Sequence, residues 1–496
     1  MSSEVHHINK QMAKGSAWMT IFKFIEKSIS VVSTIILARL LTKEDFGIAA
    51  IAMIVIALLD LFRAFGFEMA LIQNQESTRE HYDTVWSFNI ISSILLAIVL
   101  IVFSPNIAKF YNDNRLLEIM PLLAIGVFVS GFYNVGIVNY RKELEFHKDF
   151  IFLLSRKLIT FVAAISLAFY FRNYWALIGA FVFSNIAVVI LSYFIHEYRP
   201  RFSLKQTKDL FSFSGWIFIN NLLGFALQKL PELLIGKLVG IGSLGIFSLT
   251  HEITLTTSGT IVFAVNRATL PGYSKLSNNY AALKASLLNT LGLLSVIIIP
   301  ASIGLSAIAP IMVPVLLGDK WLESIQIMEI LAYSGLLFNI ANLTSIYLAI
   351  GKPKINTFIK AARILVYIPI LILSIPYFGL QGVAWSLLIT SIIMLPIYYW
   401  PAMKIIDIKL AELVSIFIRP IIASIVMLIV LKFIFSGYIV NTNLTHNIFE
   451  LIYFILTGIF TYTIILIMLW HISGRPIGSE RHIIDIVRRK LVTQNI

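Results

Sequence analysis

Segments of 20 or more mostly apolar residues recur along the whole chain, separated by short polar stretches. A helix needs about 20 apolar residues to cross a hydrocarbon core roughly 30 Å thick, and only helices and closed barrels satisfy the backbone in lipid. Barrel strands alternate in polarity over about 10 residues, whereas these segments are longer and uniformly apolar. The pattern predicts an all-α polytopic membrane protein with about 14 transmembrane helices. The expected spans are 15–40, 45–72, 84–104, 118–140, 151–171, 174–195, 215–238, 240–265, 285–309, 325–349, 358–375, 379–400, 415–435 and 448–471.

Composition supports this class and excludes others. The chain has 496 residues, of which 58% are hydrophobic and 13% charged, whereas soluble domains are about half apolar and about 25% charged. The absence of cysteine excludes disulfides and thiol chemistry. The longest polar connections, 196–214 and 266–284, are too short for a soluble catalytic domain, and no phosphate-binding loop or paired-cysteine motif is present. We therefore expect a membrane protein that is not an enzyme, with no cofactor and no metal site.

The placement of lysine and arginine predicts the orientation. If the amino terminus is cytoplasmic, most basic loop residues fall on the inner side, as the positive-inside rule requires. The inner set is Lys10, Lys14, Arg141, Lys142, Lys148, Arg199, Arg201, Lys205, Lys208, Arg267, Lys275, Lys284, Lys352, Lys354, Lys404 and Lys409, with the tail "RPIGSERHIIDIVRRK". The outer set is Lys43, Lys109, Arg115, Arg172 and Lys320. Both termini are thus expected inside, and the net charge of +13 is explained by anionic membrane lipids rather than nucleic acid.

An internal repeat groups the expected spans. "SAWMTIFKF", from Ser16, corresponds to "SGWIFINNL", from Ser214, and the same offset of 198 residues aligns Arg39 with Lys237 and Gly47 with Gly245. Farther on, "SRKLITF" matches "ARILVYI" at a slightly larger offset. Six spans separate the copies, so the repeats share one topology, and such parallel repeats form two lobes around a cleft. The expected organisation is a six-helix lobe at 1–200, a second at 201–400, two additional helices at 401–475 and a basic cytoplasmic tail at 476–496.

The first two spans of each lobe carry polar faces. Lys23 and Lys27 lie on one face of the first span, and Asp60 and Arg63 lie three residues apart on the second. A charge at the centre of a bilayer costs roughly 2.5–3.5 kcal/mol on insertion scales, so such groups usually face a bundle interior or a water-filled cavity. The candidate substrate-binding residues are Lys23, Lys27, Arg63, Lys229, Arg39, Lys237, Asn221 and Gln228. The candidate proton-coupling or charge-pairing residues are Glu26, Asp60, Glu232 and Glu252.

Structural explanations compete with these assignments. The opposite charges at Lys23 and Glu26, and at Asp60 and Arg63, can neutralise each other locally. Arg39 and Lys237 lie near the outer ends of their spans and can extend to the interface instead. For Arg156, Lys157 and Arg363, near the inner ends, that interfacial interpretation is the favoured one, and His251 is more typical of a buried structural histidine.

Several motifs resemble a known family. The stretch "ILARLLTKEDFGIAAIAMIVIALLDLFRAFGFEMALIQ" resembles the start of Wzx-type polysaccharide flippases, of the multidrug/oligosaccharidyl-lipid/polysaccharide exporter superfamily. Further similarity lies in "FSPNIAKFYNDNRLLEIM", "YRKELEF", "RPRFSLKQTKDLFSFSGW", "LLIGKLVGIGSLGIFSL" and "NRATLPGYSKL". The set covers residues 15 to about 400 and is most similar to the branch of colanic-acid and teichuronic-acid exporters. Where many members have an aspartate a few residues before "LLIGK", this chain has Glu232.

The resemblance implies two pseudo-symmetric six-helix lobes in a V-shaped pair that opens alternately to either side of the bacterial cytoplasmic membrane. It also implies export of an undecaprenyl-pyrophosphate-linked oligosaccharide for cell-surface polysaccharide, with membrane lipids around it and polymerase or chain-length machinery as candidate partners. The excess of basic over acidic candidates suits an anionic ligand, because Arg and Lys give charge-assisted hydrogen bonds. The alternative is a drug/cation antiporter of the same superfamily, which should have an acidic cavity. A membrane enzyme and a lipid scramblase are further alternatives.

The orientation can be tested with topology reporters. A reporter fused after Lys490 or near Lys205 should give a cytoplasmic signal, and one at Asn112 an external signal, because the basic loops lie on one side. Opposite signals would refute the orientation.

Overall fold

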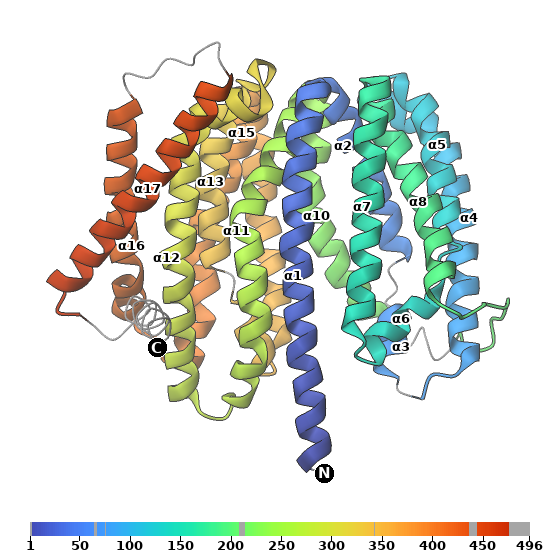
Figure 1. Ribbon diagram of the computed structural model, residues 1–496, viewed down its shortest axis with the longest axis horizontal. Helices are drawn as coiled ribbons and strands as arrows, with labels where there is room; N and C mark the ends of the chain where they lie inside the picture. Colours follow the sequence, from blue (N-terminus) through green and yellow to red (C-terminus); the bar gives the residue numbers. More distant parts are fainter. Residues whose placement is uncertain are drawn as a thin grey trace. The chain divides into compact units, whose positions relative to one another are not determined.

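The computed structural model describes residues 2–63, 67–74, 76–207, 214–341, 343–435 and 444–475. All regular structure in these ranges is helical, which confirms the predicted fold class (Figure 1). The chain divides into two compact units, Met1–Leu249 and Thr250–Ile496. The predicted lobe boundaries at residues 200 and 400 stay predictions.

The first unit is a bundle of long helices interrupted by short ones. Within it α4 packs on α5, α5 on α8, α8 on α7 and α7 on α1, while α2 packs on α10. Its elements are α1 (Ser2–Leu40), α2 (Lys43–Arg63), α3 (Phe67–Gln73), α4 (Arg79–Tyr111), α5 (Arg115–Ser130), η1 (Val135–Ile137), α6 (Val138–Lys142), α7 (Phe146–Phe171), α8 (Trp175–Ile195), α10 (Ser214–Leu238) and the start of α11 (Ile241–Lys275). The division of 215–265 into two helices is confirmed, and Gly240 at the break has a φ of +116° that favours glycine.

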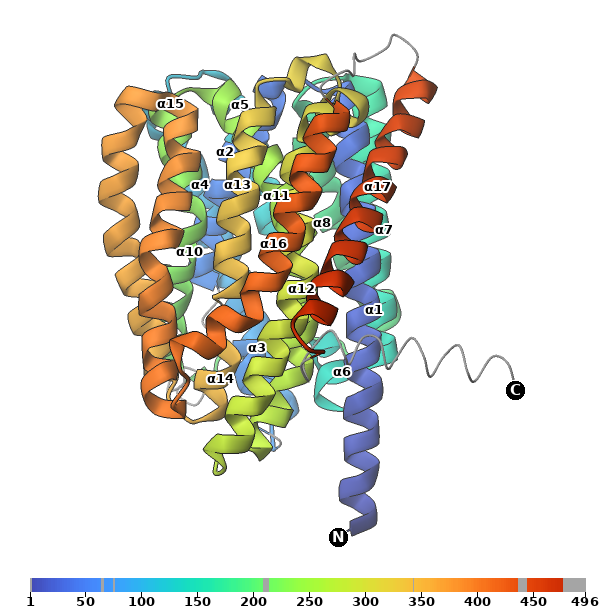
Figure 2. The ribbon, with the colours of Figure 1, turned by 90° about the vertical axis from the view of Figure 1, so that its left-hand side faces the viewer.

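The second unit contains the rest of α11 and eight further elements. They are α12 (Tyr280–Met312), η2 (Val313–Leu317), η3 (Asp319–Trp321), α13 (Ser324–Ile340), α14 (Thr344–Ala349), α15 (Pro353–Ile406), α16 (Leu410–Phe435) and α17 (Leu444–Ile472). The 54-residue α15 turns back on itself at Gly379, whose φ is +52° (Figure 2). A β-carbon on Gly382 would lie 2.5 Å from the carbonyl oxygen of Ser374, so the two legs touch through their backbones. The expected spans 358–375 and 379–400 correspond to these legs.

Nine helices in the described ranges are long and apolar enough to span a membrane, or ten if the bent pair of α5 with η1 and α6 forms one span. The protein is therefore a multi-pass membrane protein. Helices α1, α10 and α11, which carry predicted polar faces, are too polar to be counted among these spans. The predicted number of about 14 spans therefore stays a prediction.

Two predicted spans are interrupted in the structure. The expected span 45–72 is divided between α2, which ends at Arg63, and α3, which begins at Phe67. The expected span 118–140 bends by 61° between α5 and η1. The Asn134 side chain fixes this second bend, because it accepts a bond from the Gly136 amide (2.9 Å) and donates to the Tyr198 carbonyl (2.9 Å). A hydropathy pattern cannot reveal a bend that depends on such a distant partner.

The connection after α8 is fastened to the start of α4. The carboxylate of Asp83, a buried residue, accepts hydrogen bonds from the Tyr198 hydroxyl and the Arg201 amide, and Ser87 accepts one from the Ser203 amide (2.9 Å). Burial lowers the pKa of His196 below its ordinary value, so the ring is neutral at pH 7 and its Nδ1 accepts a bond from the Tyr198 amide (3.0 Å). These bonds hold the segment that in turn anchors Asn134.

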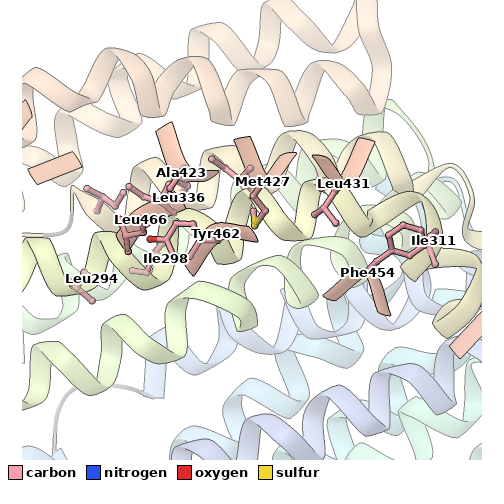
Figure 3. Close-up of a cluster of buried hydrophobic side chains, with 14 of the residues drawn as sticks. Leu294, Ile298, Ile311, Leu336, Ala423, Met427, Leu431, Phe454, Tyr462 and Leu466 are labelled. Carbon is pink, nitrogen blue, oxygen red and sulfur yellow. The ribbon is translucent and has the colours of Figure 1, made fainter. Parts of the chain in front are cut away.

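A buried apolar cluster joins α12, α13, α16 and α17 in the second unit (Figure 3). Leu294, Ile298 and Ile311 come from α12, and Met427 and Phe454 from α16 and α17. Lipid tails are as apolar as these side chains, so close packing rather than escape from water favours the association. The Tyr462 hydroxyl adds a bond to the Val296 carbonyl (2.8 Å).

The packing contribution can be measured on one helix. Phe454→Ala should lower the free energy of unfolding by about 3–5 kcal/mol, because Phe454 is 2% exposed and its loss leaves a cavity. Phe460→Ala, on the same helix but 69% exposed, is the control and should have little effect. Thermal unfolding in detergent measures both variants. Equal decreases in stability would contradict the packing role of Phe454.

Candidate functional site

A cavity of about 790 Å³ lies within the first unit. Helices α2, α3, α4, α5, α7 and α8 line it, together with Arg141 from α6 and Asn221 from α10. Its charged lining residues are Asp60, Arg63, Glu68, Arg141 and Arg156. The polar groups Asn89, Ser130, Tyr133, Thr160, Ser184, Asn185 and Asn221 also line it. The volume is within the 300–1,000 Å³ range of small-molecule sites.

Arg63 occupies the last turn of α2, where the helix ends at the cavity. Its Nη1 donates to the Ser130 hydroxyl (2.8 Å) and lies 3.7 Å from the Asp60 carboxylate. Its Nε is buried, and no acceptor for it exists in the described ranges. The guanidinium is held in position but keeps an unused donor.

Arg141 lies on α6, beyond the bend after α5, and connects two carboxylates. Its Nη2 lies 3.4 Å from Glu68 on α3, and its Nε lies 3.7 Å from Asp149 on α7. Asp149 is fully buried, and the nearby guanidinium offsets part of the cost of its charge. The Arg141 Nε has no hydrogen-bond acceptor among the described residues, so this contact is an ion pair without a hydrogen bond.

Arg156 lies on α7, one turn before Thr160, and both residues line the cavity. Its positive charge acts on Asp60 and on Tyr133. Its guanidinium is not within ion-pair distance of any carboxylate in the described part of the chain. The sequence favoured an interfacial position for this arginine, and the structure instead places it in the cavity lining.

Among the described residues, the lining therefore contains three guanidinium groups and two carboxylates. A guanidinium has five N–H donors and no acceptor. The Nε atoms of Arg63 and Arg141 are buried and have no acceptor in the described part of the chain. Such donors form short, charge-assisted hydrogen bonds with carboxylate or phosphate oxygens. The cavity is thus suited to a ligand that is anionic and rich in acceptor oxygens.

The sequence candidates separate into two groups. Asp60, Arg63 and Asn221 line the cavity. The other nine are Lys23, Lys27, Arg39, Lys229, Lys237, Gln228, Glu26, Glu232 and Glu252, and none of them lines it. Their role in binding or coupling stays a prediction.

Several of the remaining candidates have local partners. Lys23 bonds to Glu26 on α1 (2.7 Å), and Lys229 bonds to Glu232 on α10 (2.8 Å). The Lys237 ammonium lies 5.0 Å from the centre of the Phe110 ring, a cation–π contact. The pair of Lys23 with Glu26 is the local neutralisation that competes with a binding role, whereas the contacts of Lys229 and Lys237 were not predicted.

Sequence reasoning missed Glu68, Arg141 and Arg156 as cavity residues. Arg141 was assigned to an inner loop, because nothing in the sequence marked the bend that brings α6 to the cavity. For Arg156 a usable signal existed, since Thr160 follows four residues later on the same helical face. The four-residue spacing of two polar side chains on α7 marks a face turned towards polar surroundings.

Comparison with known proteins gives the family. The model of a family described as "Polysaccharide biosynthesis protein" matches residues 36–326, more than half of the chain. The chain belongs to this family. The predicted resemblance to Wzx-type flippases is thereby confirmed.

Curated relatives extend the match over most of the length. The chain is 23% identical over 406 residues to the lipopolysaccharide biosynthesis protein WzxC of Escherichia coli, with 80% of this chain and 82% of the relative covered. It is 24% identical to the teichuronic acid biosynthesis protein TuaB of Bacillus subtilis, with 83% and 86% covered. It is 22% identical to the succinoglycan biosynthesis transport protein ExoT of Rhizobium meliloti, with 92% and 93% covered.

Two solved structures have a fold similar to that of this chain. The lipid II flippase MurJ in an inward closed conformation superposes with a TM-score of 0.75 at 16% identity, with 92% of this chain and 99% of that chain covered. An inward-facing multidrug transporter of the MATE family gives 0.61 at 15% identity, with 78% and 98% covered. At these identities the similarity establishes the fold alone.

The role of Arg141 in stability can be tested. Arg141→Met should lower the free energy of unfolding by about 3–5 kcal/mol, because the buried Asp149 carboxylate loses its guanidinium. Lys148→Met removes an exposed pair with Glu145 and should cost less than about 1 kcal/mol. Thermal unfolding in detergent gives both values. Adding Asp149→Asn to Arg141→Met should recover most of the loss, and no recovery would show that Arg141 stabilises the fold in another way.

Proposed function

We propose that the protein moves an undecaprenyl-pyrophosphate-linked oligosaccharide across the bacterial cytoplasmic membrane, for the biosynthesis of a cell-surface polysaccharide. The observation that carries this proposal is the cavity lined by Arg63, Arg141 and Arg156. Pyrophosphate supplies the anionic, acceptor-rich group that those guanidinium donors suit. The proposed role is transport and not catalysis.

The names of similar proteins point the same way. WzxC and TuaB are named for lipopolysaccharide and teichuronic acid biosynthesis, ExoT for succinoglycan transport, and MurJ as a lipid II flippase. Three of these names refer to polysaccharide biosynthesis, and two of the four refer to transport or flipping. Polymerase or chain-length machinery remains a candidate partner, and membrane lipids are the expected surroundings.

The cavity has room for the head of such a substrate rather than for a finished polymer. Asn89, Asn185 and Asn221 can donate to and accept from sugar hydroxyls, and the aromatic rings of Tyr133, Phe152 and Phe181 offer apolar faces. A volume of about 790 Å³ accommodates a pyrophosphate with a few sugar rings. The proposal is therefore one repeat unit per transport cycle.

The cavity carboxylates can hold the arginines in place between cycles. Asp60 lies close to Arg63, and Glu68 lies close to Arg141. An entering anion competes for the same guanidinium donors, so its binding is coupled to the release of these carboxylates. We infer that the protein exposes this basic cavity to one side of the membrane and then to the other, as proteins with two parallel repeats do.

The alternative is a drug/cation antiporter, because a MATE transporter shares the fold. A cationic drug requires an acidic or π-rich site. Here the described lining residues carry three guanidinium groups and two carboxylates, and the excess positive charge would repel such a cargo. The charge of the lining therefore favours the anionic substrate.

The proposal can be tested in proteoliposomes that contain an undecaprenyl-pyrophosphate oligosaccharide. Arg63→Gln and Arg156→Gln should each slow translocation about 10- to 100-fold, because a charge-assisted hydrogen bond contributes about 1.5–3 kcal/mol. Lys148→Gln, which removes an exposed cation outside the cavity, is the control and should translocate normally. Normal translocation by both arginine variants would exclude the cavity as the anion site. Faster uptake of a cationic dye by these variants would favour the antiporter.

A further inference from the structure

Two glycines at equivalent positions of the internal repeat face each other's helices in the first unit. A β-carbon built on Gly47 of α2 would lie 1.9 Å from the Ile241 carbonyl oxygen. One built on Gly245 of α11 would lie 1.8 Å from the Lys43 carbonyl oxygen. No side chain fits at either position, because in both cases the obstacle is backbone.

These two contacts are related by the repeat. Gly245 lies 198 residues after Gly47, and Ile241 lies 198 residues after Lys43. The contact of Gly47 with Ile241 is therefore the counterpart of the contact of Gly245 with Lys43. Such reciprocity defines an isologous contact, in which the same surface from two copies meets across a two-fold axis. A third contact obeys the same offset, since a β-carbon on Gly242 would lie 3.0 Å from a carboxylate oxygen of Glu44.

The crossing lies at one end of its helices. Lys43 and Ile241 are the first residues of α2 and α11, and the basic-loop pattern places Lys43 on the outer side. The last turn of α10 immediately precedes α11 in the sequence, and it packs on the last turn of α4. A β-carbon on Gly236 would lie 2.8 Å from the Tyr111 ring, and Lys237 lies over the Phe110 ring. Backbones in contact leave no path between α2 and α11 at this point.

We propose that the crossing of α2 and α11 at Gly47 and Gly245 is the outer closure of the transport path, and that it separates each time the cavity opens to the outside. This inference rests on the proposed alternating access. A carrier with two parallel repeats must part them on the outer side in one of its states. Backbone contacts of this kind, Cα–H against carbonyl oxygen, are individually weak, so they oppose separation of the helices only slightly.

Because the two contacts are equivalent, alanine substitutions at the two glycines should have the same effect. Gly47→Ala and Gly245→Ala should each prevent the closure, and the two should act alike because their contacts are equivalent. Translocation should fall about tenfold or more in both, which corresponds to roughly 1.4 kcal/mol. Gly272→Ala is the matched control on α11, because nothing lies within 4 Å of a β-carbon there, and it should be normal.

Separation can be measured independently of transport, because the chain has no cysteine of its own. Ile48 and Ile246, which are also repeat equivalents, are 0% and 1% exposed beside the crossing. Ile246→Cys combined with Gly47→Ala, and Ile48→Cys combined with Gly245→Ala, should react with a membrane-impermeant maleimide about tenfold faster than the same cysteines combined with Gly272→Ala. Unchanged labelling in both glycine variants would overturn the proposal.

A reversible cross-link tests the closure without introducing a clash, and it serves if the alanine variants fail to fold. Glu44→Cys together with Gly242→Cys should form a disulfide under mild oxidation, detected as loss of maleimide labelling. The oxidised protein should lose translocation about tenfold or more, reduction should restore it, and either single cysteine should be unaffected. Normal translocation with the disulfide formed would overturn the proposal. If the unmodified protein moves no lipid-linked oligosaccharide at all, the proposed function fails, while the labelling result still decides whether the crossing opens.

Discussion

The cost of keeping a guanidinium charge inside an apolar bundle determines the arrangement of the first unit. Arg63 and Arg141 are each supported by oxygen atoms from a different element, Ser130 of α5 and Asp149 of α7. These partners can reach the arginines only because α2 stops at Arg63 and the chain bends after α5. Irregular backbone at membrane depth is tolerated where it is enclosed in protein or lines a cavity. The helix interruptions and the buried charges are therefore two aspects of one structural solution.

The sequence predicted the helices well and their interruptions only partly. Long apolar segments are sufficient to predict helices in a membrane, and the break within 353–406 coincides with the position where two spans were separated, at Gly379. The bend at Asn134 was not predictable, because it depends on the carbonyl of Tyr198, which lies 64 residues farther along the chain. Hydropathy describes the surroundings of a segment and contains no information about which distant backbone group satisfies a polar side chain.

The candidate site shows the same division. The spacing of Asp60 and Arg63 was sufficient to place both on one helical face, and Asn221 was found from the polar face of its span. Arg141 was assigned to an inner loop, because a straight helix over the expected span 118–140 would end just before it. Lys23 and Glu26 of α1 bond to each other and do not line the cavity, so their role in binding or coupling stays a prediction. A polar face on a membrane helix requires polar partners, and these can be residues of the same helix as well as a ligand.

The matched arginines of the two repeats have different surroundings. Arg156 and Arg363 correspond in the motifs "SRKLITF" and "ARILVYI". In the first unit Arg156 faces the cavity, with no carboxylate at ion-pair distance in the described ranges. In the second unit Arg363 lies 4.2 Å from the centre of the Phe338 ring and 3.5 Å from the Tyr398 hydroxyl.

A guanidinium stacked on a ring and hydrogen-bonded to a hydroxyl has part of its binding capacity occupied by the protein itself. The first copy keeps that capacity available at a cavity. At Gly47 and Gly245 the two copies make the same kind of backbone contact. At the matched arginines, by contrast, the side-chain surroundings differ between the copies. The anion-binding chemistry is therefore expected in the first repeat.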